Sequence, residues 1–183
     1  MQNQLEDRQL LNDLINGWMH RDLGEWDQLR NLFHADGTIE ITWFEGLASD
    51  FVDGSMRMGQ SDLRTKHLIA SPTVTFNAAG NKAILETNAM IIGENVKLNL
   101  GCECHNRFYD LAEKRDGVWK LFHRQSIYDM GTFTFPLGPV AIDQNVVSKY
   151  PREYATLAYL LELSGFPLNR VFLRRAAVHW KSR

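Results

Sequence analysis

KLNLGCECHNRFYDLAEKRDGVWKLFHRQSIYDMGTF, residues 97–133, is the stretch that decides the fold class of this 183-residue chain. It contains two long runs, 97–113 and 118–133, in which apolar and polar residues tend to alternate as they do in a β-strand. The Arg-Asp-Gly sequence between the runs is a turn signal. Two strands joined by so short a turn are antiparallel neighbours, so we predict a long hairpin here.

The same pattern extends from this hairpin toward the N-terminus. Residues 73–76 and 82–92 have the composition of two further strands, and short turns containing Ala-Ala-Gly-Asn and Gly-Glu-Asn separate the runs. Consecutive strands joined by short turns predict a β-meander.

The first third of the chain has helical spacing instead. Leu11, Leu14, Ile15 and Trp18 recur at intervals of three and four residues, which places them on one face of a helix. Ser61 has the side chain of a helix N-cap. We therefore expect helices over residues 5–20, 25–33 and 61–67, a strand over 38–44 and a loop over 45–58.

Helices followed by a meander predict the α+β class, with the sheet curling over the helices. We divide the chain into an α+β domain over residues 1–133 and a C-terminal helical extension over 134–183. Prolines at the expected first turns predict extension helices over 151–163 and 167–180. The extension is expected to pack on the same domain or on a neighbouring subunit.

Composition excludes several classes of partner. The net charge of −2 gives no basic surplus for binding nucleic acid or an anionic membrane. The N-terminus lacks the basic segment and apolar core of a secretory signal. No apolar run is long enough to span a bilayer. We expect a cytoplasmic protein that binds neither nucleic acid nor membrane.

The two cysteines, Cys102 and Cys104, lie two positions apart in an expected strand. Their Cα atoms would be roughly 7 Å apart along it, beyond the roughly 5.5 Å that a disulfide prefers. His105 alternates to the opposite face, so the three do not form a metal site. We expect the two cysteines to act as small buried hydrophobic residues.

Four motifs occur in an order that is typical of one superfamily. Residues 22–37 combine an aspartate, a tryptophan-containing helix and Phe-x-x-Asp before a strand. His67 follows, a few residues before the strand over 73–76. The Asp-Gly-Val-Trp hairpin at 116–119 comes next, and Arg124 lies five residues beyond its tryptophan. Together they resemble the SnoaL-like branch of the nuclear transport factor 2-like superfamily, which includes scytalone dehydratase and hexachlorocyclohexane dehydrochlorinase.

The resemblance implies a cone-shaped curved antiparallel sheet around the N-terminal helices, a homo-oligomer (dimer or trimer), and Asp22, His67 and Arg124 as catalytic groups. An ionised Asp22 would orient the His67 imidazole, which would remove a proton from carbon. Arg124 would hold the developing negative charge. Taken without the resemblance, Asp22 is typical of a helix-end turn, His67 is more often a core or capping histidine, and Arg124 is typical of a structural ion pair.

Further residues are expected to bind the substrate: Tyr128, Ser126, Trp43, Phe44, Ile39 and His105. Alternation places Tyr128 on the same strand face as Arg124 and Ser126, so it is the candidate proton donor. The resemblance puts Ile39 at a pocket position, and the aromatic pair that follows it would wall the cavity. His105 either extends the pocket or belongs to a polar sheet face.

The function implied is a cofactor-independent lyase, without a metal, that eliminates water or a related group from a small hydrophobic, ring-containing molecule. Two other activities would use the same fold: a ketosteroid-isomerase-like or polyketide-cyclase-like enzyme, or a protein that binds a hydrophobic ligand without chemistry. The fold alone does not distinguish them, because members of one superfamily differ in function.

Overall fold

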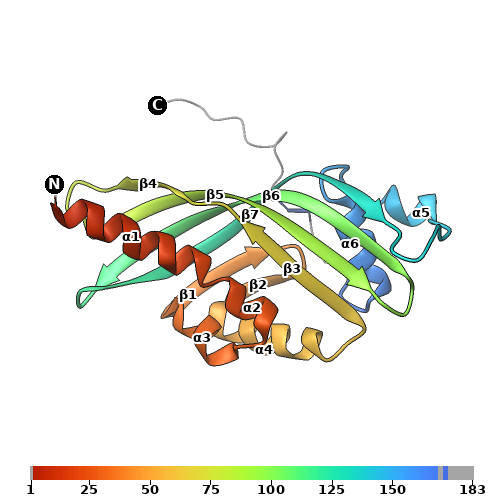
Figure 1. Cartoon of the computed structure of the whole chain (residues 1–183), viewed down its shortest axis with the longest axis horizontal. Helices are drawn as coiled ribbons and strands as arrows, with labels where there is room; N and C mark the ends of the chain where they lie inside the picture. The colour runs from red at the N-terminus through yellow and green to blue at the C-terminus, as the bar shows by residue number, and fades with distance from the viewer. Residues whose placement is uncertain (1, 169–170, 173–183) are drawn as a thin grey trace.

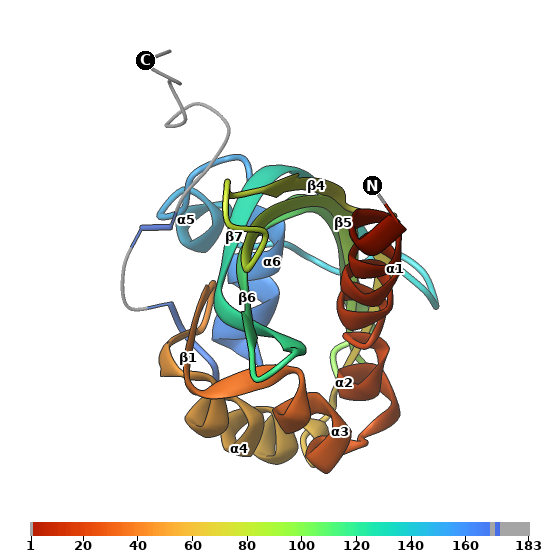
Figure 2. The ribbon, with the colours of Figure 1, turned by 90° about the vertical axis from the view of Figure 1, so that its left-hand side faces the viewer.

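The computed structural model describes residues 2–168 and 171–172, and it has the α+β architecture predicted from the sequence. A seven-stranded sheet curls into a half-barrel (Figure 1). Figure 2 shows the sheet arching over the interior, with the N-terminal helices along its open side. Among the described residues, no helix has both the length and the apolar character needed to cross a membrane.

Three long antiparallel strands form the centre of the sheet and confirm the predicted meander: β5 (Lys82–Asn95), β6 (Leu100–Arg115) and β7 (Val118–Thr134). Asp116 and Gly117 form the β6–β7 turn with φ angles of 51° and 80°. A two-residue hairpin turn of this hand needs positive φ at both positions, which an Asp-Gly pair adopts at low cost.

Shorter strands flank this centre on both sides. β1 (Phe33–Ile41) runs parallel to β7, and β2 (Phe44–Leu47) pairs antiparallel with β1. On the opposite side, β3 (Leu63–Ile69) and β4 (Thr73–Phe76) both pair antiparallel with β5. The parallel β1–β7 contact brings the N-terminal half of the chain against the last long strand.

The loop predicted over residues 45–58 is wrong, because most of this segment is helix α4 (Ala48–Gly59). Phe51, Ser55 and Met58 share its buried face at helical spacing. The glycines suggested a loop, but Gly54 has a packing role. A Cβ atom there would lie 2.9 Å from the Trp43 ring, so glycine lets that ring lie against the helix.

The helix predicted over residues 61–67 is also wrong, because the chain forms β3 there. Ser61 does cap, but it caps the turn that follows α4. Its hydroxyl donates to the Met58 carbonyl at 2.7 Å and accepts from the Leu63 amide at 3.1 Å. Burial alternates regularly along β3, but Leu68 is an apolar residue at an outward position, so it disrupts the apolar–polar alternation that would have revealed a strand.

The two predicted N-terminal helices are three: α1 (Gln2–Asn16), α2 (Met19–Leu23) and α3 (Trp26–Asn31). Gly24 ends α2 with a φ angle of 72°, and its amide donates back to the helix. This left-handed position suits glycine and fixes where α2 stops. Asp22 therefore lies one residue from the end of α2.

The C-terminal part contains α5 (Gln144–Val147), which the sequence did not predict, and α6 (Ala155–Leu163), within the predicted 151–163. Helix α6 is almost entirely buried and packs against β5, β6 and β7. The helix predicted over 167–180 lies largely outside the described residues. The four of its residues that are described, 167–168 and 171–172, have no regular secondary structure.

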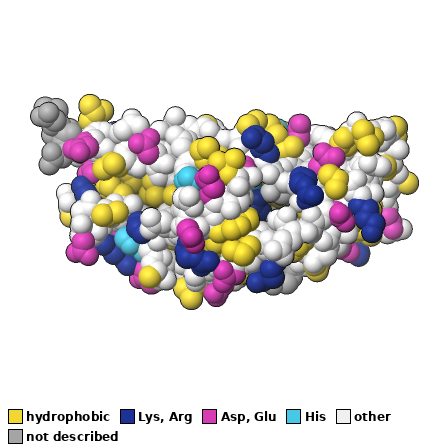
Figure 3. Space-filling view, turned by 60° about the horizontal axis from the view of Figure 1, so that its bottom comes forward, with side chains coloured by type: hydrophobic (Ala, Val, Ile, Leu, Met, Phe, Trp, Pro, Cys, Tyr) yellow, Lys and Arg dark blue, Asp and Glu magenta, His cyan; other side chains and the backbone are white. Residues whose placement is uncertain are grey.

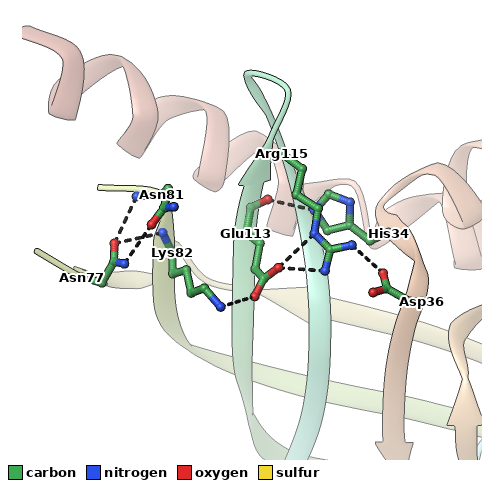
Figure 4. A network of polar contacts seen from close by, with 7 residues as sticks. All are labelled: His34, Asp36, Asn77, Asn81, Lys82, Glu113 and Arg115. Carbon is green, nitrogen blue, oxygen red and sulfur yellow. Dashed lines mark hydrogen bonds and ion pairs between the residues drawn. The ribbon is translucent and has the colours of Figure 1, made fainter. Parts of the chain in front are cut away.

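Ion pairs tie the β6–β7 hairpin to its neighbours (Figure 4). Arg115 donates to Glu113 on its own strand and to Asp36 on β1, at 2.7 to 2.9 Å. Lys82 on β5 contacts Glu113 at 2.7 Å. His34 Nε2 lies 2.9 Å from the Glu113 carbonyl oxygen. These partly exposed contacts hold the β6–β7 turn end to β1 and β5.

The interior contains two apolar clusters. One lies under the N-terminal helices and includes Trp18, Phe51 and Phe108, whereas the other lies against α6 and includes Tyr154 and Leu160. Trp43 packs against both clusters. On the face in Figure 3, lysine and arginine side chains are interspersed with aspartate and glutamate.

Candidate active site

A small cavity, the cone cavity, lies where the two apolar clusters meet. Its volume is about 30 Å³, and its walls include Trp18, Trp43, Phe108, Leu157 and Leu161. A few polar side chains also face it: Arg21, Thr42, Thr65, His67, Ser126 and Tyr128. An apolar wall with a few converging polar groups is typical of a small-molecule site.

Asp22 and His67 form a two-point contact at the edge of this cavity. The His67 backbone amide donates to Asp22 Oδ2 at 2.7 Å, and His67 Nδ1 lies 2.7 Å from Asp22 Oδ1. The two side chains are only 10% and 6% exposed. An ionised carboxylate accepting from Nδ1–H fixes the tautomer in which Nε2 is the basic nitrogen.

The surroundings shift the pKa values of both groups downward. Burial lowers the pKa of His67 most; the Asp22 carboxylate raises it, while the charges of Arg21 and Arg124 lower it further. Burial alone would raise the pKa of Asp22, but hydrogen bonds and charge from His67, together with Arg21, outweigh it. At neutral pH the dyad is therefore a neutral imidazole beside a carboxylate, which is the state of a general base.

Arg124 lies behind the cavity wall rather than on it. Its Nε and Nη2 atoms donate to the two carboxylate oxygens of Asp110, each at 2.8 Å, and both side chains are fully buried. The guanidinium carbon lies 4.3 Å from the Trp18 ring centre and 4.2 Å from that of Phe108. Within the described residues, Nη1 has no hydrogen-bond partner.

Tyr128 and Ser126 both line the cavity. Alternation along β7 predicted that they share one face of the strand with Arg124, and all three are buried there. The Tyr128 hydroxyl oxygen accepts from the Thr42 amide at 2.9 Å. Burial raises the pKa of Tyr128 to about 12, so the phenol stays protonated. Ser126 accepts a hydrogen bond from Asn106 at 2.7 Å.

The remaining sequence-predicted residues take different places. Trp43 lines the cavity, whereas Phe44 packs behind it on Trp43 and Phe51. Ile39 is buried beside Arg124 in the β1–β7 register but is not part of the wall. His105 is exposed on the outer side of the sheet, so it belongs to the polar face rather than to the pocket.

Arg21 is a cavity residue that the sequence analysis did not select. Its Nη1 donates to the Thr65 hydroxyl at 2.6 Å, and its Nη2 lies 3.4 Å from the Met58 sulfur. The available signal was its position three residues after Trp18, on the buried side of the helical pattern. The sequence did not indicate Thr65 and Met58 as partners of Arg21, because their segments were predicted as a helix and a loop instead of β3 and α4.

Metal ligation receives no support from the geometry. Within residues 2–168 and 171–172, no group of three or more His, Cys, Asp or Glu side chains is placed to hold an ion. Cys102 and Cys104 are free and buried on the inner face, as expected for small hydrophobic residues.

The curled α+β half-barrel and the cavity inside it define the class of protein to which this chain belongs. The sequence profile of the SnoaL-like domain family matches residues 3–125, and this chain belongs to that family.

Individual relatives are more distant. An uncharacterized protein from Aspergillus terreus is 28% identical over 180 residues; the match covers 85% of this chain and 65% of that relative's length. A scytalone dehydratase-like protein from Novosphingobium aromaticivorans superposes with a TM-score of 0.64 at 19% identity, covering 77% of this chain and all of that one. A hexachlorocyclohexane dehydrochlorinase superposes with a TM-score of 0.62 at 20% identity, and the match covers 76% of this chain and 95% of that one. The two structural likenesses establish the fold.

Proposed function

We propose that this protein is a cofactor-independent lyase that eliminates a small group from a hydrophobic, ring-containing molecule. The observation that carries the proposal is the Asp22–His67 contact at the cavity. A neutral imidazole, oriented by a carboxylate and facing an apolar space, is suited to removing a proton from carbon near neutral pH.

The reaction would need no cofactor. His67 Nε2 takes the proton from a carbon next to an activating group, which holds the C–H electron pair as an anion. That pair then forms the carbon–carbon double bond of the product as the leaving group departs with its own bonding pair. Asp22 stabilises the imidazolium that forms. If hydroxide leaves, Tyr128 is the candidate donor that converts it to water, because its phenol is protonated and lines the cavity.

The walls favour an apolar substrate, and the names of the two structural neighbours, a dehydratase and a dehydrochlorinase, agree with elimination. A cavity of about 30 Å³ holds roughly one water molecule. A ring-containing molecule therefore requires the wall to open. Trp43, which packs against both apolar clusters, and the α6 residues Leu157 and Leu161, which belong to the second, form part of this wall.

Proton abstraction can be tested before the natural substrate is known. Hydrogen–deuterium exchange at the acidic carbons of a panel of small ring ketones, 2-tetralone among them, reports the step by NMR in D2O. We expect the protein to accelerate exchange and His67→Ala to reduce the acceleration by about 100-fold or more. Asp22→Asn should also reduce it. His105→Ala, which removes an exposed histidine, is the matched control.

Exchange at the wild-type rate in both His67→Ala and Asp22→Asn would overturn the proposal, as would no exchange with any ketone of the panel. Product analysis with β-hydroxy ketones separates the alternatives: an unsaturated ketone indicates elimination, and a shifted double bond or a new ring indicates isomerisation or cyclisation. Ligand binding without exchange indicates a binding protein.

Assembly forms part of the proposal. We expect a homo-oligomer, a dimer or trimer, with residues 134–183 as an extension that helps close the cone cavity. The inward positions of Leu157 and Leu161 support the closing role. Sedimentation of the full chain tests the assembly, and a monomer would contradict it.

A further inference from the structure

Arg21 is a buried cation at the wall of the cone cavity. It lies on α2 next to Asp22 and is only 8% exposed. Its Nη1 atom lies 3.8 Å from Asp22 Oδ1, and Arg21 lines the same cavity as His67. Burial lowers the pKa of Arg21, and the Asp22 carboxylate raises it. Because the ordinary pKa of arginine is so high, Arg21 stays charged at neutral pH and places a positive charge beside the base.

The partners of Arg21 are weak for a buried guanidinium. In the part of the chain that the structure describes, Nη1 donates to the Thr65 hydroxyl, and Nη2 has only the Met58 thioether, at 3.4 Å. A thioether sulfur is a weak acceptor. Among the described residues, the one carboxylate within 4 Å of the Arg21 guanidinium is Asp22, whose two oxygens are already bound at 2.7 Å by the amide and ring of His67. A stronger acceptor in the cavity could therefore replace the sulfur at little cost.

Arg124 differs from Arg21 in this respect. Its guanidinium is held by both oxygens of Asp110 and enclosed by two aromatic rings, and it does not line the cavity. Bidentate pairing with a carboxylate fixes its position and neutralises much of its charge. Of the two buried arginines near His67, Arg21 is the one with a donor that a ligand can reach.

We propose that Arg21, rather than Arg124, binds the oxygen of the substrate as it becomes negatively charged, and that the substrate is an enolisable carbonyl compound. As His67 takes the proton, the C–H electron pair forms a carbon–carbon double bond and the carbonyl π pair moves onto oxygen. Arg21 donates a charge-assisted hydrogen bond to that oxygen and transfers no proton. This inference rests on the proposed function for the proton-abstraction step.

A phenolate resembles an enolate in charge and geometry, so it tests the site without turnover. We would titrate 4-nitrophenol into the protein and follow the phenolate absorption band against pH. The wild type is expected to bind the phenolate about 10- to 100-fold more tightly than the phenol, as a cation within a few ångströms of an acid predicts. Arg21→Met should lose this preference, and Arg21→Lys should keep part of it.

Arg64→Gln is the matched control, because Arg64 is an exposed arginine on the same strand as Thr65. It is expected to bind like the wild type. The inference is overturned if the wild type shows no preference for the phenolate. It is also overturned if the folded Arg21→Met variant keeps all or nearly all of that preference, or if the folded Arg21→Lys variant keeps all of it. Circular dichroism establishes that each variant is folded.

The two proposals fail in different ways. His67→Ala should keep the phenolate preference, since binding an anion needs no base, while losing ketone exchange. Ketone exchange at the wild-type rate in His67→Ala refutes the assignment of His67 as the base but does not affect the anion site at Arg21. A phenolate preference that is unchanged in Arg21→Met refutes the anion site but does not affect the assignment of His67 as the base.

Discussion

Arg124 and Asp110 occupy paired positions on the neighbouring strands β7 and β6, and they form a two-point ion pair that is closed off from solvent. The Arg124 guanidinium lies over the rings of Trp18 and Phe108, two members of the first apolar cluster. Its geometry gives Arg124 a partner that holds the guanidinium in place. The charge acts on His67 through space, by lowering the pKa of its imidazole.

Breaking this pair from one side should be strongly destabilising. Arg124→Met leaves Asp110 buried without its partner, and we expect a loss of about 3–5 kcal/mol in the free energy of unfolding, measured in urea. Arg124→Met combined with Asp110→Leu should recover much of it. Arg30→Ala, which removes the exposed pair with Asp53, should cost about 1 kcal/mol or less. Equal losses for the buried and exposed pairs would contradict this account.

The pH dependence of exchange should follow His67. Its pKa lies below the usual 6.5, so the neutral, active form dominates at pH 7 and kcat/KM should fall only as the pH drops through that lowered value. Asp22 raises this pKa, so in Asp22→Asn the acid limb should move to still lower pH, with a reduced plateau. A limb that moves upward in Asp22→Asn would contradict the assignment.

Two glycines in α4 offer a matched pair for the cavity wall. A Cβ at Gly54 would meet the Trp43 ring at 2.9 Å, whereas one at Gly59 would meet the Trp26 ring at an ordinary 3.5 Å. Gly59→Ala should stabilise by up to about 1 kcal/mol through helix propensity. Gly54→Ala should gain less or lose stability, because Trp43 must shift, and it should also alter phenol binding.

Thermal unfolding and phenol titration measure the two effects. Since Trp43 lines the cavity and Trp26 does not, only the Gly54 variant should change the binding constant. A change of the same size in both variants would contradict the assignment of Trp43, and not Trp26, to the cavity wall.

The cysteines should be inert until the protein unfolds. Burial raises the pKa of Cys102 to about 12 and raises that of Cys104 further still. The thiolate is the reactive form, so neither thiol should react with Ellman's reagent at pH 8 in the native state, and both should react in urea. Rapid labelling of the native protein would mean that the inner face of β6 opens readily.

The sequence predicted those parts of the fold in which local pattern and tertiary role agree. β4 was predicted with its observed bounds, and the long strands β5 to β7 closely, because alternation and Asp-Gly turn chemistry act over a few residues. It failed between residues 45 and 69, where Gly54 serves a tertiary contact and Leu68 faces outward. At Gly54 the packing partner, and not the neighbouring residues, explains the amino acid. At Leu68 an apolar residue occupies an exposed strand position, so the local pattern does not indicate a strand.

For the site, the sequence by itself determined which residues could do the chemistry: an aspartate, a histidine and an arginine at positions that a family resemblance connects, and a phenol that alternation places on the strand face of the arginine. Only the tertiary structure decided which of them meet. Asp22 reaches His67 because α2 ends beside β3, a contact across 45 residues of chain. Arg21 faces the cavity while Arg124 is held by Asp110, because side-chain direction follows from packing among distant segments, which no local pattern encodes.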